Sequence, residues 1–109
     1  MTGGWITQAD RSGWQQRAAA ELAAILAAHP GIPVIAWTVT ASGGALSGQV
    51  LAPAAGRRGL FAEWRQALGL DNVTETPSAN GAAVYLHARG VRGGVRVSIT
   101  ATVFSQDGP

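Results

Sequence analysis

The chain has 109 residues, of which 47% are hydrophobic, and this size and composition fit one domain with a modest core. It contains no cysteine, which excludes disulfides, thiolate catalysis and cysteine-ligated metal centres. Every basic residue is arginine, so the pI of about 10.5 accompanies a net charge of only +2 and does not by itself indicate a polyanionic ligand.

The beginning of the chain, MTGGWITQAD, has neither the basic nor the apolar segment of a signal peptide, and we expect a cytoplasmic protein. The longest apolar stretch, residues 18–28, contains Glu21 and is shorter than the roughly 20 residues that a membrane-spanning helix needs. We expect a flexible N-terminal arm over residues 1–12, a single domain over residues 13–105 and a C-terminal tail over residues 106–109.

The first predicted element is a helix over residues 14–29, along which apolar side chains recur at intervals of three and four residues. Two N-caps compete, because both Thr7 and Ser12 stand three residues before a polar side chain that completes a capping box. We favour Ser12, since an earlier start places Gly13 inside the helix at a cost of about 1 kcal/mol.

The end of this helix is marked by the sequence LAAHPGIP. Pro30 cannot continue a helix and disfavours the helical conformation of the residue before it. His29 closes the apolar face of the helix, so we interpret it as a structural residue at the helix end rather than as an active-site imidazole.

Next come a predicted hairpin and a second helix. Residues 34–41 are rich in β-branched and aromatic side chains, and after a glycine-containing turn residues 45–51 supply a second strand, a pattern typical of a β-hairpin. Residues 60–68 have helical periodicity, with Gly69 in the position of a C′ glycine and Leu70 able to make the hydrophobic contact that follows it.

Three further strands are predicted over residues 72–76, 81–89 and 95–104. The last two alternate apolar and polar side chains, as expected of an antiparallel sheet covered on one face. The predicted fold is therefore α+β, with an antiparallel sheet of four or five strands, two helices packed on one face and the order α-β-β-α-β-β-β. Similar apolar spacing in the two helices also suggests a degenerate helix–hairpin repeat.

The alanine-rich helix, LAAHPGIP, the hairpin, FAEWRQALGL and ARGVRGGVRV together resemble a group of small uncharacterised proteins of actinobacteria that are associated with phages or integrative mobile elements. The resemblance spans roughly residues 14–104. It implies an origin and an accessory role, and it implies no site residues.

The sequence offers no catalytic residue, metal ligand or cofactor site. His29 and His87 are far apart and neither has a carboxylate at a suggestive spacing, while the carboxylates are scattered along the chain. The glycine runs match neither dinucleotide nor P-loop fingerprints. We therefore predict a protein that is not an enzyme and takes no small-molecule cofactor.

Our leading hypothesis is a non-enzymatic binding or accessory module that acts through a protein partner, including a second copy of itself. The back of the first helix is nearly all alanine and carries little charge, and a tryptophan precedes it. The expected interface residues are Trp5, Ala20, Ala24 and Ala27.

The alternative is a nucleic-acid-binding protein that uses an arginine-bearing β-hairpin. Arginines flank the glycine-rich turn of ARGVRGGVRV, and an aromatic residue lies on the neighbouring polar strand face. The expected contact residues are Tyr85, His87, Arg89, Arg92 and Arg96, to which Arg57 and Arg58 add charge.

Overall fold

The computed structural model describes residues 6–40, 44–51 and 53–104. Two α-helices, a short 3₁₀ turn and five strands follow the order α-β-β-α-β-β-β, which confirms the predicted fold class. The elements are α1 (Gln8–Ala28), β1 (Ala36–Val39), β2 (Ala45–Gln49), η1 (Ala54–Gly56), α2 (Arg57–Leu68), β3 (Asn72–Pro77), β4 (Ala83–Arg92) and β5 (Val95–Phe104).

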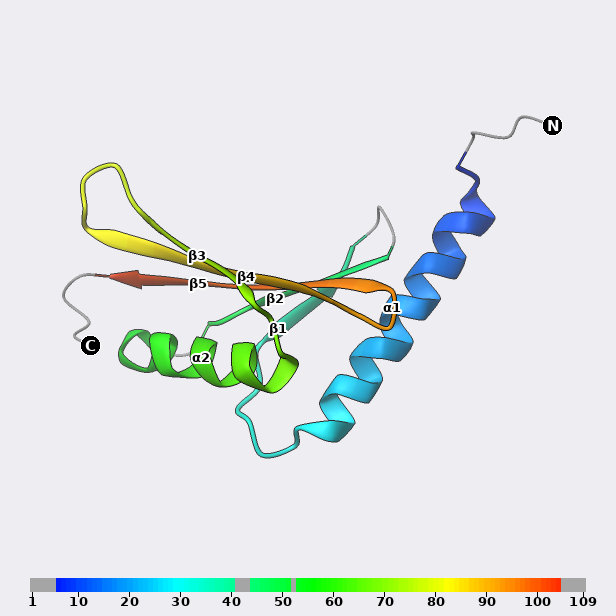
Figure 1. Ribbon diagram of the computed structural model, residues 1–109, viewed down its shortest axis with the longest axis horizontal. Helices are drawn as coiled ribbons and strands as arrows, with labels where there is room; N and C mark the ends of the chain where they lie inside the picture. Colours follow the sequence, from blue (N-terminus) through cyan, green and yellow to red (C-terminus); the bar gives the residue numbers. More distant parts are fainter. Residues whose placement is uncertain (1–5, 41–43, 52, 105–109) are drawn as a thin grey trace.

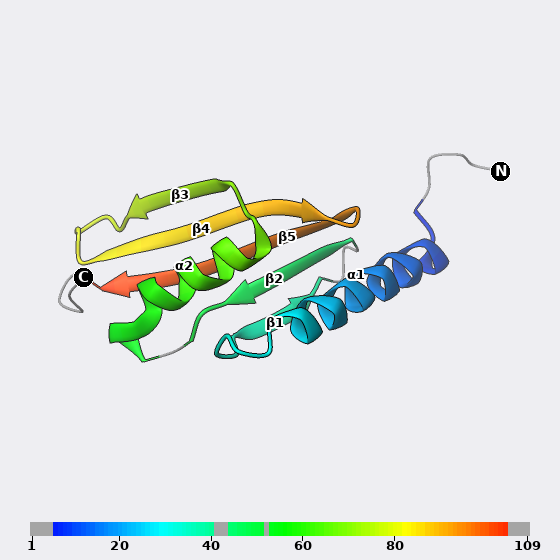
Figure 2. The same ribbon diagram turned by 60° about the horizontal axis from the view of Figure 1, so that its bottom comes forward.

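The five strands form one sheet in the order β1-β2-β5-β4-β3 (Figure 2). All neighbouring pairs are antiparallel except β2 and β5, which run parallel, so the sheet is mixed although mostly antiparallel. The two longest strands, β4 and β5, lie in its interior. Both halves of the chain contain a helix and a hairpin, but β3 has no counterpart in the first half.

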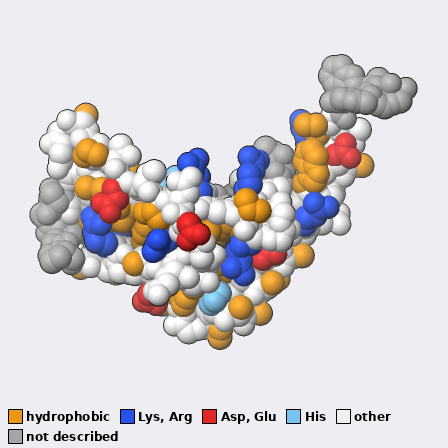
Figure 3. Space-filling model, viewed as in Figure 1, with side chains coloured by type: hydrophobic (Ala, Val, Ile, Leu, Met, Phe, Trp, Pro, Cys, Tyr) orange, Lys and Arg blue, Asp and Glu red, His pale blue; other side chains and the backbone are white. Residues whose placement is uncertain are grey.

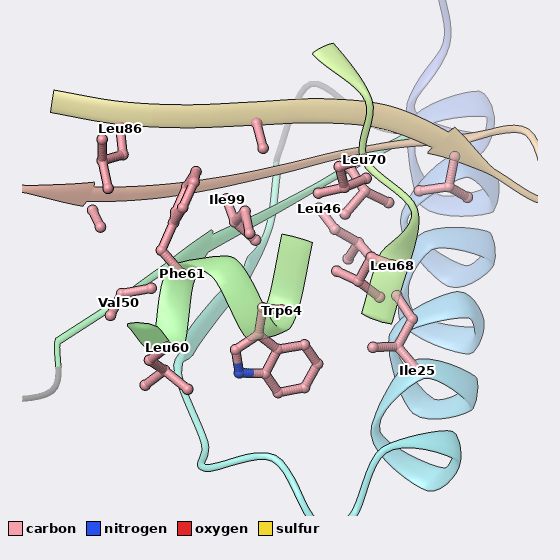
Figure 4. Packing of buried hydrophobic residues seen from close by; sticks show 14 of the residues in the cluster. Ile25, Leu46, Val50, Leu60, Phe61, Trp64, Leu68, Leu70, Leu86 and Ile99 are labelled. Carbon is pink, nitrogen blue, oxygen red and sulfur yellow. The ribbon is translucent and has the colours of Figure 1, made fainter. Parts of the chain in front are cut away.

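Both helices lie on the same side of the sheet and leave its other face uncovered (Figure 1). Helix α2 packs along β5, whereas α1 crosses the end of the sheet near β1 and β2. Apolar side chains of both helices and of the inward strand positions form the core (Figure 4). Its largest fully buried members are Trp64, Ile25, Leu46, Leu70, Ile99, Val95 and Val97.

Trp64 of α2 connects the core to the segment that follows α1. Its indole Nε1 donates a hydrogen bond to the carbonyl oxygen of Pro33 at 2.9 Å. The ring makes edge contacts with Trp37, at 5.7 Å between centroids, and with His29, at 6.2 Å. His29 is the C-cap of α1, and its backbone N–H bonds the carbonyl oxygen of Ile25. The interpretation of His29 as the structural end of the helix is thereby confirmed.

Helix α1 starts earlier than the sequence suggested. Thr7 is its N-cap, with the hydroxyl accepting from the backbone N–H of Asp10 and the Asp10 carboxylate accepting from the N–H of Thr7, both at 3.0 Å. The two hydrogen bonds of this capping box offset the cost of about 1 kcal/mol for placing Gly13 inside the helix. The prediction of Ser12 as the N-cap was wrong, and residues 8–12 belong to α1 rather than to an N-terminal arm. Residues 1–5 and 105–109 lie outside the described part of the chain.

Helix α2 ends as predicted. Gly69 adopts a left-handed conformation with φ of 65°, and the N–H of Leu70 bonds the carbonyl oxygen of Arg65 at 3.1 Å. Leu70 is buried against the core. This arrangement combines the backbone bonds of a glycine-terminated helix with the hydrophobic contact that accompanies them, and it turns the chain into β3.

Candidate functional site

The strand registers divide the sheet into a helix-covered face and an uncovered one, which we call the open face. Residues directly paired across neighbouring strands share a face. The open face therefore contains the following residues of the four strands β2 to β5: Ala45, Ser47 and Gln49; Asn72, Thr74 and Thr76; Ala83, Tyr85, His87, Arg89 and Val91; and Arg96, Ser98, Thr100, Thr102 and Phe104.

Two arginines meet on this face. Arg89 of β4 pairs with Ser98 of β5, and Arg96 stands two residues before Ser98. The arginines are thus diagonal neighbours, whose Cα atoms in such a pair lie roughly 7–8 Å apart. Both side chains are exposed, and neither makes an ion pair or hydrogen bond with any residue that the structure describes.

The described strand residues of the open face give the two arginines no compensating negative charge. None of the strand residues on the open face is aspartate or glutamate. The single acid of β3, Glu75, lies on the helix-covered side, 3.5 Å from the guanidinium of Arg58. The open face is therefore positively charged, although the whole chain has a net charge of only +2.

The surface around the arginines is hollowed. A depression of about 500 Å³ is lined by residues of four strands, among them Asn72, His87, Arg89, Arg96 and Ser98. Figure 3 shows the surface in the view of Figure 1, with basic side chains projecting from a concave upper edge between two raised ends. The side chains offer guanidinium, imidazole, amide and hydroxyl groups, which together suit an anionic ligand with further hydrogen-bonding groups.

Tyr85 lies on the same face, two and four residues before His87 and Arg89 along β4. Its side chain is 50% exposed, and it makes no hydrogen bond or ring contact with a described residue. Its paired neighbours are Thr76 and Thr102, whose short side chains leave the ring accessible. Four of the five predicted nucleic-acid contacts, Tyr85, His87, Arg89 and Arg96, are thus brought together.

Arg92, the fifth, lies on the opposite face. Its guanidinium Nη1 donates to the carbonyl oxygen of Leu68 at 3.3 Å, and its Nε lies 3.5 Å from the carboxylate of Glu21. The strand extends to Arg92 instead of ending at Arg89, and because Arg92 is an odd number of residues from Arg89, the pleat turns it toward the helices.

Arg57 and Arg58 do not join the open-face cluster either. Arg57 begins α2 and donates from Nη1 to the carbonyl oxygen of Thr102 at 3.1 Å, and its guanidinium also lies over the ring of Phe104. Arg58 pairs with Glu75 on the helix-covered side. Both arginines support the packing of α2 against the sheet.

The predicted protein interface is described only in part. Ala20, Ala24 and Ala27 lie on α1 and are exposed, whereas Trp5 falls outside the described residues. Of the 21 residues of α1, only Ala18 and Ile25 are buried. Much of this helix therefore presents small apolar side chains to solvent.

Sequence reasoning missed Asn72 and Ser98 as members of the site. Asn72 pairs directly with Arg89 across β3 and β4, and Ser98 pairs with Arg89 across β4 and β5. The alternation of residues 95–104 already put Ser98 on the polar face, but only the register brings both residues next to Arg89.

Within the described part of the chain, no three histidine, aspartate or glutamate side chains come together as a metal site. No helix among the described residues is long and apolar enough to cross a membrane. Comparison with known protein families and with curated proteins finds no match. The resemblance to small actinobacterial proteins associated with mobile elements stays a prediction.

Proposed function

We propose that this protein is a non-enzymatic module that binds nucleic acid through the open face of its sheet. The observation that carries the proposal is that Arg89 and Arg96 meet in a hollow whose described lining residues include no aspartate or glutamate. From the sequence alone, a protein partner was the leading hypothesis. The convergence of Tyr85, His87 and the two arginines on one face now favours a nucleic acid over a protein partner.

The electrostatic argument concerns two like charges held side by side. Guanidinium groups stay ionised at any physiological pH, and here neither has a counter-charge among the described residues. A phosphate bound between them removes their mutual repulsion and accepts charge-assisted hydrogen bonds, which arginine forms in a bidentate manner. Because the strand register already holds Arg89 and Arg96 side by side, binding does not have to bring the two guanidinium groups together.

A nucleic acid fits this surface better than a small anion does. The charged pair continues along β4 into His87 and Tyr85, and hydroxyl side chains of the neighbouring strands border this row. Phosphates, bases and sugars each find a matching group there, whereas a lone anion uses only the arginines. We expect this role in the cytoplasm, and we expect it to require no cofactor.

The test is fluorescence anisotropy with labelled DNA and RNA oligonucleotides at about 50 mM and about 200 mM salt. We expect an affinity that falls steeply with salt, since binding releases counterions from the phosphates. The double variant Arg89→Ala/Arg96→Ala should flatten the slope of log K against log salt concentration by about 1.4–1.8, the contribution of two phosphate contacts.

A matched control removes the same charge from another place. Arg11 and Arg17 are exposed on α1, so Arg11→Ala/Arg17→Ala lowers the net charge equally without touching the open face. Equal losses in the two double variants, or no binding by the wild type at about 50 mM salt, would refute the proposal.

A protein partner, including a second copy of the chain, remains the second candidate. It is favoured by the exposure of Ala20, Ala24 and Ala27 on a helix with only two buried residues. Light scattering over a range of concentrations tests self-association. We expect Ala20→Glu/Ala24→Glu to prevent assembly, because it puts charges into an apolar contact; a wild type that stays monomeric throughout contradicts self-association.

A further inference from the structure

We infer that the nucleic acid bound by the open face is single-stranded, with one base stacked on Tyr85 and the backbone continuing past His87 to phosphate contacts with Arg89 and Arg96. The inference rests on the proposed function and adds to it the form of the ligand and a role for Tyr85. The observations that carry it are the accessibility of the Tyr85 ring and the interior position of the strands that bear these residues.

The ring of Tyr85 is the stacking platform. Among the described residues the only other strongly exposed aromatic side chain is Phe104, whose ring already contacts the guanidinium of Arg57. A half-exposed aromatic ring on a sheet, flanked by short threonine side chains, offers its face to a planar base. Every base has such a face, so stacking on tyrosine binds single strands without strict sequence preference.

The spacing along β4 suits an extended strand. Side chains on one face of a strand recur about every 6.6–6.8 Å, so Tyr85 and Arg89 are roughly 13 Å apart along β4. This side-chain repeat is close to the spacing of successive nucleotides in an extended single strand, so the distance from Tyr85 to Arg89 spans two such repeats. A base at Tyr85 and a phosphate at Arg89 can therefore belong to one short stretch of the same backbone.

A duplex fits this surface poorly. Hairpins that read a groove must project into it, but β4 and β5 lie inside the sheet, with β3 on one side and β2 on the other. The arginines stand in a depression rather than on a ridge. The base faces of a duplex are also hidden within its stack, so Tyr85 has nothing to stack on. The expectation of an arginine ribbon entering a groove is replaced by a platform for an unpaired strand.

The experiment compares three probes of about 12 nucleotides, a length within the usual site sizes of such surfaces. They are a mixed-sequence single strand, the same strand with abasic sites, and its duplex, each titrated with the wild type, Tyr85→Ala and Tyr85→Phe. We expect the wild type to prefer the normal single strand over both other probes. Tyr85→Ala should weaken single-strand binding by about 5- to 150-fold, the usual loss for one stacked base.

The remaining comparisons separate stacking from charge. Tyr85→Phe keeps the ring and should bind like the wild type, and Tyr85→Ala should no longer distinguish normal from abasic strands. Equal melting temperatures of the two variants establish that both are folded. Duplex binding as tight as single-strand binding, or no effect of Tyr85→Ala, overturns the inference while the arginine-dependent binding of the proposed function stands. Absence of binding to every probe overturns the proposed function itself.

Discussion

The guanidinium of Arg92 and the carboxylate of Glu21 connect the end of the sheet to the middle of α1. The Nε atom of Arg92 lies 3.5 Å from Oε2 of Glu21, and both side chains are mostly buried. Nε itself has no directed hydrogen bond, so this contact is an ion pair, while Nη1 bonds the last carbonyl of α2. A Cβ atom at Gly93 would lie 2.6 Å from the same carboxylate, which shows how closely the β4–β5 turn approaches α1.

Arg92→Ala should destabilise the fold without weakening nucleic-acid binding. It removes one ion pair and one charged hydrogen bond that are partly screened by solvent, so we expect the free energy of unfolding to fall by about 1–2 kcal/mol. Urea denaturation measures this loss. Arg89→Ala, on the open face, should show the opposite combination of unchanged stability and weaker binding. A variant at Arg92 that loses affinity at full stability would place this residue in the interface after all.

The N-cap of α1 can be identified by comparing two alanine variants. Thr7→Ala should destabilise the first turn by about 1 kcal/mol, because the N–H of Asp10 loses its acceptor. Ser12→Ala should change little, since the Ser12 hydroxyl accepts only from the side chain of Gln16. The first turns of α1 are exposed and can fray locally, so amide hydrogen exchange is the suitable measurement. A larger effect at Ser12 would indicate that the helix starts later.

The same cap makes the start of α1 sensitive to acid. The backbone N–H of Thr7, followed by its hydroxyl, holds the pKa of the Asp10 carboxyl below its ordinary value of 3.8. A carboxyl whose pKa is lower in the folded state stabilises that state fully above its unfolded pKa, and the contribution is lost as the pH falls through the folded pKa. We expect the protection factors of the first-turn amides, which correct for the intrinsic slowing of exchange in acid, to fall below about pH 4 in the wild type. Asp10→Asn should lack this pH dependence.

Two glycines should respond oppositely to alanine. A Cβ atom at Gly48 would lie 2.8 Å from Ile35 and 3.1 Å from both Ile99 and Trp37, so Gly48→Ala should lower the free energy of unfolding by about 1–3 kcal/mol. At Gly13 nothing lies within 4 Å, and Gly13→Ala should stabilise α1 by up to about 1 kcal/mol. Denaturation curves measure the first change and hydrogen exchange the second. A neutral Gly48→Ala would mean that the sheet adjusts at this position without cost.

The order and type of the elements followed from local patterns. Pro30 stops α1 at His29 because it cannot supply the backbone N–H of a continuing helix, and Gly69 stops α2 because it adopts the left-handed conformation easily. The alternation of apolar and polar side chains over residues 95–104 predicted β5 with the bounds that the structure has. The start of α1 was missed because two capping boxes have similar sequence signals, and only their actual hydrogen bonds separate them.

The candidate site was predictable where it depends on the pleat of a single strand. Tyr85, His87 and Arg89 are every second residue of β4, so they share a face whichever strands pair with β4. Arg92 was misassigned because β4 continues to Arg92, so its side chain follows the pleat onto the side of α1 and α2.

The sequence by itself determined the helices, the strands and the alternation of side chains along each strand, because these depend on residues close together in the chain. Only the tertiary structure decided that β2 runs parallel to β5, that Arg89 and Arg96 meet beside Asn72 and Ser98, and that Arg92 holds α1 and α2 instead. These relationships join segments that are distant in sequence, and the register between strands is fixed by how the whole core packs rather than by any one segment.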